Sequence, residues 1–157
     1  MSPANPANNN AIVIDASVLV SIASKEAATY LRAEKAFDSY SKNGWEFFAP
    51  NLVVGEVVFA LCQKFAAGVL TEIEYEKAVE TFLDLMKNIA APNDETDLVK
   101  RAVEIRQSYG CSRSSDGFYI AFAEDLAKMR TVEILTFDKG MTNQILKNAP
   151  TVTVKIL

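Results

Sequence analysis

The sequence contains no histidine, and this absence excludes several kinds of active site. Triads and dyads that use an imidazole base cannot form, nor can zinc sites built on histidine. The two cysteines, Cys62 and Cys111, lack the spacing of a metal-binding pair and are too few for a disulfide scaffold. Cys62 lies in an apolar run, which predicts a small core residue. Any catalysis must therefore use carboxylates, hydroxyls, amines or thiols.

The chain also lacks an apolar stretch of the roughly 18 residues that suggest a membrane-spanning helix. Its first ten residues have no positively charged side chain and no apolar core, so they do not form a secretory signal. Their proline, asparagine and alanine content predicts a disordered leader over residues 1–10, followed by one domain over residues 11–157. We expect a cytoplasmic protein that does not bind membranes.

Basic residues are few as well. Sixteen lysines and arginines face 20 acidic residues, which gives a net charge of −4. This balance argues against binding of nucleic acid through bulk positive charge. It does not exclude a nuclease, because metal ions held by several carboxylates reverse the sign of the local field.

Short β-branched runs alternate with helical patterns along the chain. The expected strands cover residues 11–15, 45–49, 89–92, 131–137 and 151–156. The expected helices cover residues 18–24, 26–41, 52–67, 71–88, 94–109, 114–130 and 139–148. This alternation predicts an α/β fold of three layers, α/β/α, around a mostly parallel sheet of four to five strands. In such sheets the reactive residues gather at the carboxyl ends of the strands.

Four acidic residues occupy positions that an amphipathic pattern does not explain. Asp15 ends the first expected strand, and Asp138 follows the fourth. Asp116 opens a helix that continues as an apolar run, and Glu56 interrupts a helix that is otherwise apolar nearly all round. Removing an unpaired carboxylate from water is costly, so a partly buried one needs a strong partner.

Each of these acids also has a purely structural explanation. The two aspartates that follow strands can cap the next helix, and Asp116 can bind backbone donors in the first turn of its own helix. Glu56 can form a buried ion pair with Lys64 or Arg113. No single position decides between the explanations.

Taken together, the four acids favour a common site. Asp15 and Asp138 both lie at the rim where α/β sites form, and Asp116 begins a helix that can point at the same rim. Carboxylates at close range raise one another's pKa, so four of them need compensating charge. Mg²⁺ and Mn²⁺ take oxygen ligands and need no histidine or cysteine. Such a site suits phosphoryl chemistry.

With these residues in view, the chain resembles the PIN-domain nucleases, and among them the VapC-like toxin ribonucleases of toxin–antitoxin pairs. The resemblance covers nearly the whole chain from Ala11 onward. Four motifs carry it in the family's order, at residues 14–17 (IDAS), 49–56 (APNLVVGE), 115–124 (SDGFYIAFAE) and 135–138 (LTFD).

The resemblance implies a metal-dependent endoribonuclease that leaves 5′-phosphate and 3′-hydroxyl ends. It implies that one or two Mg²⁺ or Mn²⁺ ions are bound by the carboxylates of Asp15, Glu56, Asp116 and Asp138. It also places the hydroxyls of Ser17 and Thr136 beside the metal-bound water.

The same resemblance implies an RNA substrate, a homodimer and a cognate antitoxin protein whose tail reaches the acidic pocket. Apolar residues of the two early helices can supply the dimer or antitoxin surface, namely Val20, Ile22, Tyr30 and Phe37. The alternative is that these four residues belong to the core, as periodic apolar faces usually do.

Two other functions compete with a nuclease. A phosphatase of the haloacid-dehalogenase type also begins with an aspartate after its first strand, but it needs a second aspartate where this chain has Ser17. A PIN-like module without catalytic activity can bind RNA or protein, but the presence of all four acids argues against it. The sequence does not indicate which RNA is cut.

Overall fold

The computed structural model describes residues 9–108 and 114–157. Its centre is a sheet of five strands in the order β3-β2-β1-β4-β5, and all neighbouring strands are parallel. The strands are β1 (Asn10–Ile14), β2 (Glu46–Phe48), β3 (Ile89–Ala90), β4 (Thr131–Thr136) and β5 (Thr153–Ile156). The α/β class with a parallel sheet is thus confirmed.

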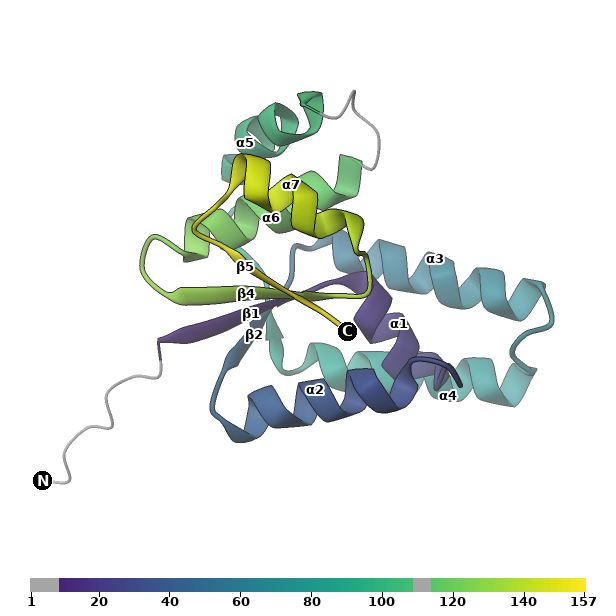
Figure 1. Ribbon diagram of the computed structural model, residues 1–157. Coiled ribbons are helices and arrows are strands. Elements are labelled where there is room, and N and C mark those ends of the chain that lie inside the picture. Colours follow the sequence, from purple (N-terminus) through teal and green to yellow (C-terminus); the bar gives the residue numbers. More distant parts are fainter. Residues whose placement is uncertain (1–8, 109–113) are drawn as a thin grey trace, which may run out of the picture.

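Helices cover both faces of this sheet, as Figure 1 shows, with α5, α6 and α7 on one side and α2 and α4 on the other. Successive side chains of β2 identify the two faces, because they point in opposite directions. Phe47 stacks on Phe37 of α2, whereas Phe48 meets Phe122 of α6 edge-on. The helices are α1 (Ala16–Ser24), α2 (Tyr30–Lys42), α3 (Leu52–Ala66), α4 (Glu72–Met86), α5 (Thr96–Gln107), α6 (Ser114–Leu126) and α7 (Gly140–Asn148).

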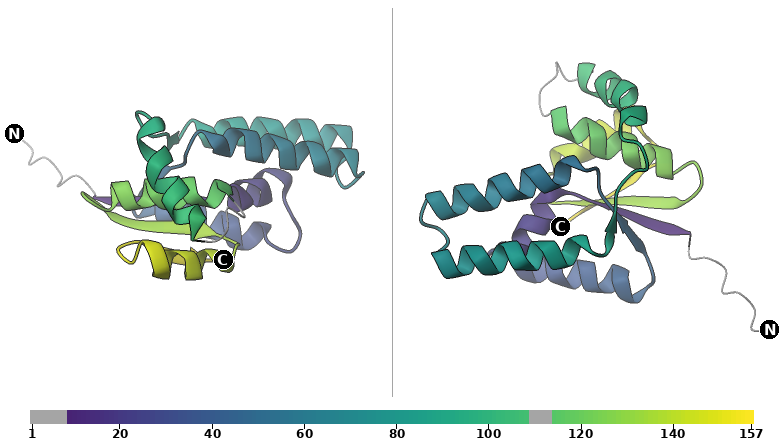
Figure 2. Two further views of the ribbon diagram at one scale, coloured as in Figure 1. Left: turned by 90° about the horizontal axis from the view of Figure 1, so that it is seen from above. Right: turned by 180° about the vertical axis from the view of Figure 1, so that it is seen from behind.

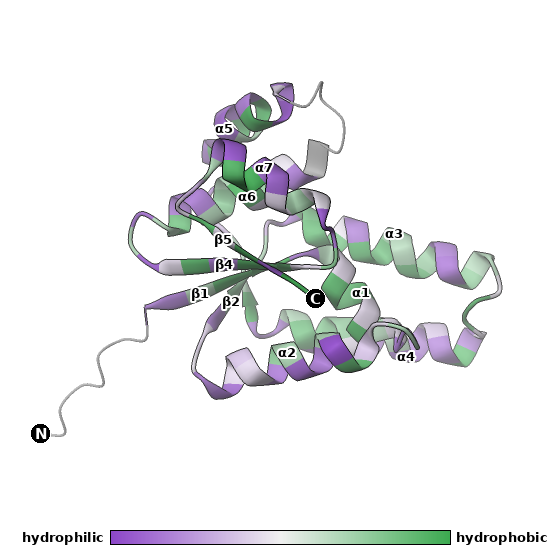
Figure 3. Cartoon of the chain, viewed as in Figure 1, coloured by the Kyte–Doolittle hydropathy of each residue, from purple (hydrophilic) through white to green (hydrophobic). Residues whose placement is uncertain are grey.

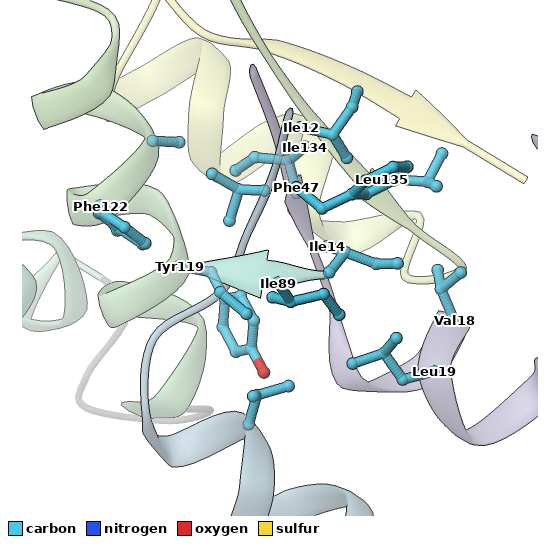
Figure 4. Close-up of a cluster of buried hydrophobic side chains, with 14 of the residues drawn as sticks. Ile12, Ile14, Val18, Leu19, Phe47, Ile89, Tyr119, Phe122, Ile134 and Leu135 are labelled. Atoms are coloured by element: carbon cyan, nitrogen blue, oxygen red, sulfur yellow. The ribbon is translucent and has the colours of Figure 1, made fainter. Parts of the chain in front are cut away.

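The core is centred on β1, the middle strand. Ala11, Ile12, Val13 and Ile14 are completely buried, because a central parallel strand is covered on both faces. Figure 4 shows Ile12 and Ile14 among the other buried side chains of the sheet. The continuous apolar run that predicts this strand is therefore explained by its position in the sheet.

Helices α3 and α4 form a hairpin that extends beyond the sheet (Figure 2). The capping box expected at Thr71 is present, with the Thr71 hydroxyl and the Glu74 carboxylate each bound to the other residue's amide. Helix α3 buries one stripe of residues at helical spacing, Val53, Val57 and Leu61. Cys62 lies outside this stripe and is exposed, so its predicted place in the core is wrong.

Apolar side chains are exposed along the same hairpin, and one residue of the early helices, Leu31 of α2, is exposed as well. Figure 3 shows hydrophobic residues along α3 as well as in the strands. Val20 and Ile22 are buried, and Tyr30 and Phe37 pack against the core, so the core alternative is confirmed for these four residues. The exposed apolar surface, which we call the α3–α4 face, consists of Val54, Val58, Phe59, Phe65, Val69, Ile73 and Leu83.

Most elements begin and end close to their expected positions, and the largest differences, of four residues each, are at the start of α2 and at the end of α6.

The difference in α2 has a local cause. The helix begins at Tyr30 rather than at Glu26, because Thr29 donates a hydrogen bond to the Glu26 carboxylate and bonds to Ser21. Such side-chain bonds compete with the first turn of a helix. Strand β1 already includes Asn10, and residues 1–8 of the expected leader lie outside the described residues.

No helix among the described residues is both long and apolar enough to cross a membrane.

Candidate active site

The carboxyl ends of β1 and β4 lie side by side in the middle of the sheet, with Ile14 paired to Leu135. The sheet continues from β1 toward β2 on one side and from β4 toward β5 on the other. This is a topological switch point, where the loops that follow the two strands diverge and leave a crevice. Asp15 and Asp138 follow these two strands, so the expectation that they share one edge is confirmed by the topology.

Asp15 is held at this edge by two hydroxyls. Its Oδ2 atom accepts hydrogen bonds from Ser17 Oγ at 2.5 Å and from Thr136 Oγ1 at 2.8 Å. Each hydroxyl also accepts a hydrogen bond from a backbone amide. The Phe137 amide donates to Ser17 Oγ at 3.2 Å, and the Asp138 amide donates to Thr136 Oγ1 at 2.9 Å. The structure therefore brings together Asp15 and both of the hydroxyl residues that the sequence singles out.

Asp15 is the N-cap residue of α1, yet these hydroxyl contacts tie its side chain to β4. Burial raises the pKa of the Asp15 carboxyl above its ordinary value, and the hydrogen bonds from Ser17 and Thr136 counteract part of this effect. Ionised Asp15 is thus costly at this position, and a nearby positive charge would stabilise it.

Asp116 lies in the first turn of α6 and faces the same edge. Its Oδ2 atom accepts a hydrogen bond of 3.0 Å from Gln144 Nε2. Arg106 in turn donates a hydrogen bond to the side-chain oxygen, Oε1, of the same Gln144. The pKa of Asp116 is raised by burial and, after the opposing Gln144 bond, by the negative charges of Asp15 and Asp138. Three carboxylates from separate elements therefore interact electrostatically.

Asp138 also has a local role before α7, although the N-cap residue of this helix is Lys139 and not Asp138 as its structural explanation predicts. Its Oδ1 atom accepts a hydrogen bond of 2.8 Å from the Gly140 amide at the start of α7. This bond fixes the direction of the loop after β4 without removing Asp138 from the neighbourhood of Asp116, whose pKa it raises. This local hydrogen bond is therefore compatible with a place for Asp138 in the site.

Glu56 is linked to the site through a buried tyrosine. Its Oε2 atom accepts a hydrogen bond of 2.6 Å from the hydroxyl of Tyr119, whose side chain is only 1% exposed. Burial and then the charges of Asp15 and Glu56 raise the pKa of Tyr119. Lys64 pairs with Glu26, so the alternative of a Glu56–Lys64 pair is wrong, and Arg113 lies outside the described residues.

Comparison with known families now identifies the fold. A sequence model of the PIN domain matches residues 12–144, which is most of the chain. The chain belongs to the PIN domain family. PIN domains are generally nucleases and generally use divalent metals. A comparison with curated proteins gave no match.

The donor set of this PIN domain fits a hard divalent cation, which prefers carboxylate oxygens. Within residues 9–108 and 114–157, no group of three or more acidic or cysteine side chains lies in an arrangement that can hold a metal ion. The carboxylates interact at longer range: burial raises the pKa of Asp15 and of Asp116, and the charges of Asp15 and Asp138 raise that of Asp116 further. A cation that drew these side chains together would supply the missing compensation.

Three residues of the site were not singled out by the sequence, namely Arg106, Tyr119 and Gln144. Each is a polar residue within the buried stripe of a helix, as Gln144 is between Met141 and Ile145 in α7. The same signal, a polar side chain in an apolar pattern, identifies Glu56. A search for this signal in every helix would have found all three.

We expect Tyr119→Phe to lower the free energy of unfolding by about 1–3 kcal/mol, because the Glu56 carboxylate loses a buried donor. Urea denaturation measures this difference. Tyr75→Phe is the control, since the Tyr75 ring stacks on Phe65 and is partly buried, whereas Tyr119 is fully buried. Equal effects of the two substitutions would show that the Tyr119–Glu56 bond does not contribute.

Gly117 is required for the close packing of α6 on α5. A Cβ atom at this position would lie 2.6 Å from Arg106 Cγ and 2.7 Å from the carbonyl oxygen of Ala102. We expect Gly117→Ala to destabilise the protein by about 1–3 kcal/mol, because a backbone oxygen cannot move aside cheaply.

Gly55→Ala is the control for this substitution. Gly55 lies in α3 and has open space where a Cβ atom would be, so the change should stabilise the protein by about 0.5–1 kcal/mol through helix propensity. Thermal denaturation of both variants checks the two signs. A stabilising Gly117→Ala would contradict the described packing.

Proposed function

We propose that this PIN domain is a metal-dependent endoribonuclease. It hydrolyses RNA phosphodiester bonds with water as the nucleophile and leaves 5′-phosphate and 3′-hydroxyl ends. The observation that carries the proposal is the geometry of this PIN domain: Asp15 and Asp138 follow the two neighbouring strands β1 and β4, and Asp116 lies close enough for their charges, after burial, to raise its pKa. This edge is the switch point where α/β proteins bind ligands.

In this proposal Asp15, Glu56, Asp116 and Asp138 hold Mg²⁺ or Mn²⁺. A cation bound there supplies neutralisation of phosphate charge and activation of water. The protein's own polar side chains hold the carboxylates in fixed positions through hydrogen bonds: Ser17 and Thr136 hold Asp15, Gln144 holds Asp116, and Tyr119 holds Glu56. Such preorganisation reduces the rearrangement that a reaction requires.

We further propose that the protein is the toxin of a toxin–antitoxin pair and forms a homodimer with an antitoxin bound. The α3–α4 face supports this part of the proposal, because several exposed apolar residues on one helical hairpin are typical of a surface that binds another protein. Expression of the wild-type chain should arrest growth, and co-expression of the antitoxin should relieve the arrest. Growth at the normal rate would contradict the toxin assignment.

Incubation of the purified protein with end-labelled single-stranded RNA tests the nuclease directly. We expect cleavage with Mg²⁺ or Mn²⁺, no cleavage in EDTA, and 5′-phosphate ends on the products. The same RNA with a 2′-deoxy backbone tests whether the activity is specific for RNA. Cleavage that persists undiminished in EDTA would contradict the proposal.

The alternative is a PIN domain that binds RNA or protein without cleaving. This alternative predicts that the end-labelled RNA is bound but that no cleavage product forms. Membership of the PIN domain family leaves no support for the haloacid-dehalogenase alternative.

A further inference from the structure

A groove of about 570 Å³ lies between α2 and the edge strand β5. We call it the α2–β5 groove, and its principal lining residues are Arg32, Lys35, Tyr40, Trp45, Lys155 and Leu157. In Figure 1 the end of β5, marked C, lies between α2 and the carboxyl end of β4. The groove therefore adjoins the edge of the sheet that carries the acidic residues.

Two contacts connect one end of the groove to the candidate active site. The amide of Leu157 donates to the carbonyl oxygen of Thr136 at 3.0 Å, and the Thr136 hydroxyl binds Asp15. The guanidinium of Arg32 lies 5.5 Å from the centre of the Phe137 ring. Phe137 directly precedes Asp138, so this end of the groove lies beside the loop that carries Asp138.

The groove gathers three cationic side chains, two from α2 and one from β5. Among the described residues, no carboxylate lies in ion-pair range of Arg32, Lys35 or Lys155. Several basic residues elsewhere are paired with acids. Lys155 lies on an edge strand, where a lysine often has the sole function of preventing pairing with another strand. Arg32 and Lys35 lie on a helix, so this explanation does not apply to them. Three cations along one groove, each without an acidic partner in the described part of the chain, indicate an anionic ligand.

The far end of the groove is aromatic. Trp45 packs edge-on against Tyr40, with ring centres 5.1 Å apart, and the Tyr40 hydroxyl donates to Glu133 at 2.5 Å. Both rings line the groove and are only partly buried. Cations beside an aromatic platform are the usual features of sites for single-stranded nucleic acid, where phosphates meet the cations and bases stack on the rings.

A second groove, of about 740 Å³, also contacts Trp45, but both cations that line it are paired with acids. It is lined mainly by β2 and β3, and none of the four candidate acids lines it. Its arginine, Arg130, is paired with Glu46 and stacks on Phe48. Its lysine, Lys87, is paired with Asp84.

We propose that the α2–β5 groove binds the single-stranded RNA segment next to the cleaved bond, with phosphates on Arg32, Lys35 and Lys155 and a base stacked on Trp45. The inference rests on the proposed function for the identity of the strand. The helix from Arg32 to its C-cap residue Asn43 spans about 16 Å at 1.5 Å per residue, which accommodates a few nucleotides. The groove thus gives an acidic protein a local surface for RNA.

Trp45 is the only tryptophan and lines both grooves, so its fluorescence detects binding in either one, and the lysine variants assign the binding to the α2–β5 groove. The probe is an oligouridylate of about 12 nucleotides, titrated in EDTA so that no cleavage is needed. We expect saturable quenching of Trp45. In Lys35→Gln/Lys155→Gln, affinity should fall by about tenfold. In a plot of the logarithm of the association constant against the logarithm of the salt concentration, the magnitude of the slope should decrease by about 1.4. This is about 0.7 for each phosphate that is no longer neutralised.

The matched control is Lys77→Gln/Lys100→Gln, which removes the same charge from α4 and α5. It should bind like the wild type, and equal weakening in both variants would overturn the groove. Absence of oligouridylate binding would also overturn the groove. A poly-glutamate peptide of equal charge that binds as tightly as RNA would overturn the RNA assignment and indicate that the groove binds an acidic protein segment.

Failure of the groove and failure of the nuclease are distinguishable. Groove-dependent RNA binding without cleavage in Mg²⁺ would overturn the proposed function and leave the groove intact. Cleavage by the wild type together with unchanged oligouridylate affinity in Lys35→Gln/Lys155→Gln would overturn the groove alone.

Discussion

Replacement of Asp15 by asparagine is expected to abolish RNA cleavage while it raises the free energy of unfolding of the metal-free protein. The amide keeps the shape of the carboxylate and can still accept the bonds from Ser17 and Thr136. It removes a buried negative charge whose pKa is raised by burial and which faces Asp116. Sites built for function commonly reduce stability, and relief of such a site stabilises a protein by about 0.5–2 kcal/mol.

Activity should fall by at least about a hundredfold, because a neutral amide cannot replace a carboxylate in a cation site. Cleavage rates and thermal denaturation in EDTA measure the two effects on one preparation. Asp38→Asn, on the exposed surface of α2, is the control and should change neither quantity appreciably. An active Asp15→Asn variant, or one that unfolds more easily than the wild type, would contradict the assignment of the site.

The second large effect is a reversal of the pH dependence of stability by Mg²⁺. Asp15 and Asp116 have folded-state pKa values above their ordinary value of 3.8. Such groups bind protons more tightly in the folded state, so they stabilise the metal-free protein fully below about pH 3.8. This stabilisation is lost as the pH rises through their folded-state pKa values. Relative to Asp15→Asn/Asp116→Asn, the metal-free wild type should therefore become less stable from acid to neutral pH.

Saturating Mg²⁺ should remove this loss, since the cation binds the ionised carboxylates. At about 100 times the dissociation constant it should stabilise the wild type by about 2.7 kcal/mol. The double variant should show neither the pH-dependent difference nor the stabilisation by Mg²⁺. Denaturation curves at several pH values, with Mg²⁺ and with EDTA, measure both. A wild type whose stability relative to the double variant rises from acid to neutral pH in EDTA would contradict the raised pKa values.

The sequence predicts the position of Asp15 and Asp138 well because the rule involved is simple. Both follow buried strands, and parallel strands end at one edge. The two hydroxyls, Ser17 and Thr136, come within reach for the same reason, since they lie two residues from these acids. Local pattern and topology together therefore predict the positions of Asp15 and Asp138, two of the four acids of the candidate site.

The environment of α3 was not predictable in this way. A helix that is apolar nearly all round indicates burial, yet α3 buries only one stripe and exposes Val58 and Phe59. Whether a second protein covers this face is not encoded in the periodicity of one helix. Cys62 was assigned to the core for the same reason, and its exposure follows from the same geometry.

The α2–β5 groove shows a third limit. Arg32 and Lys155 are separated by most of the chain and lie in segments whose local patterns indicate only a solvated helix and a short strand. Their proximity depends on β5 lying beside β4 at the edge of the sheet. Net charge, which is −4 for the whole chain, conceals this local concentration of cations.

Carbon-13 NMR of the carboxyl groups, titrated with Mn²⁺, tests the shared acidic site most directly. Paramagnetic broadening should affect the signals of Asp15, Glu56, Asp116 and Asp138 together, at the same Mn²⁺ concentrations and before those of other acids. Excess Mg²⁺ should restore all four signals. Broadening that begins at surface acids such as Glu72 or Asp84, or that separates the four residues into independent events, would contradict a single cation-binding site.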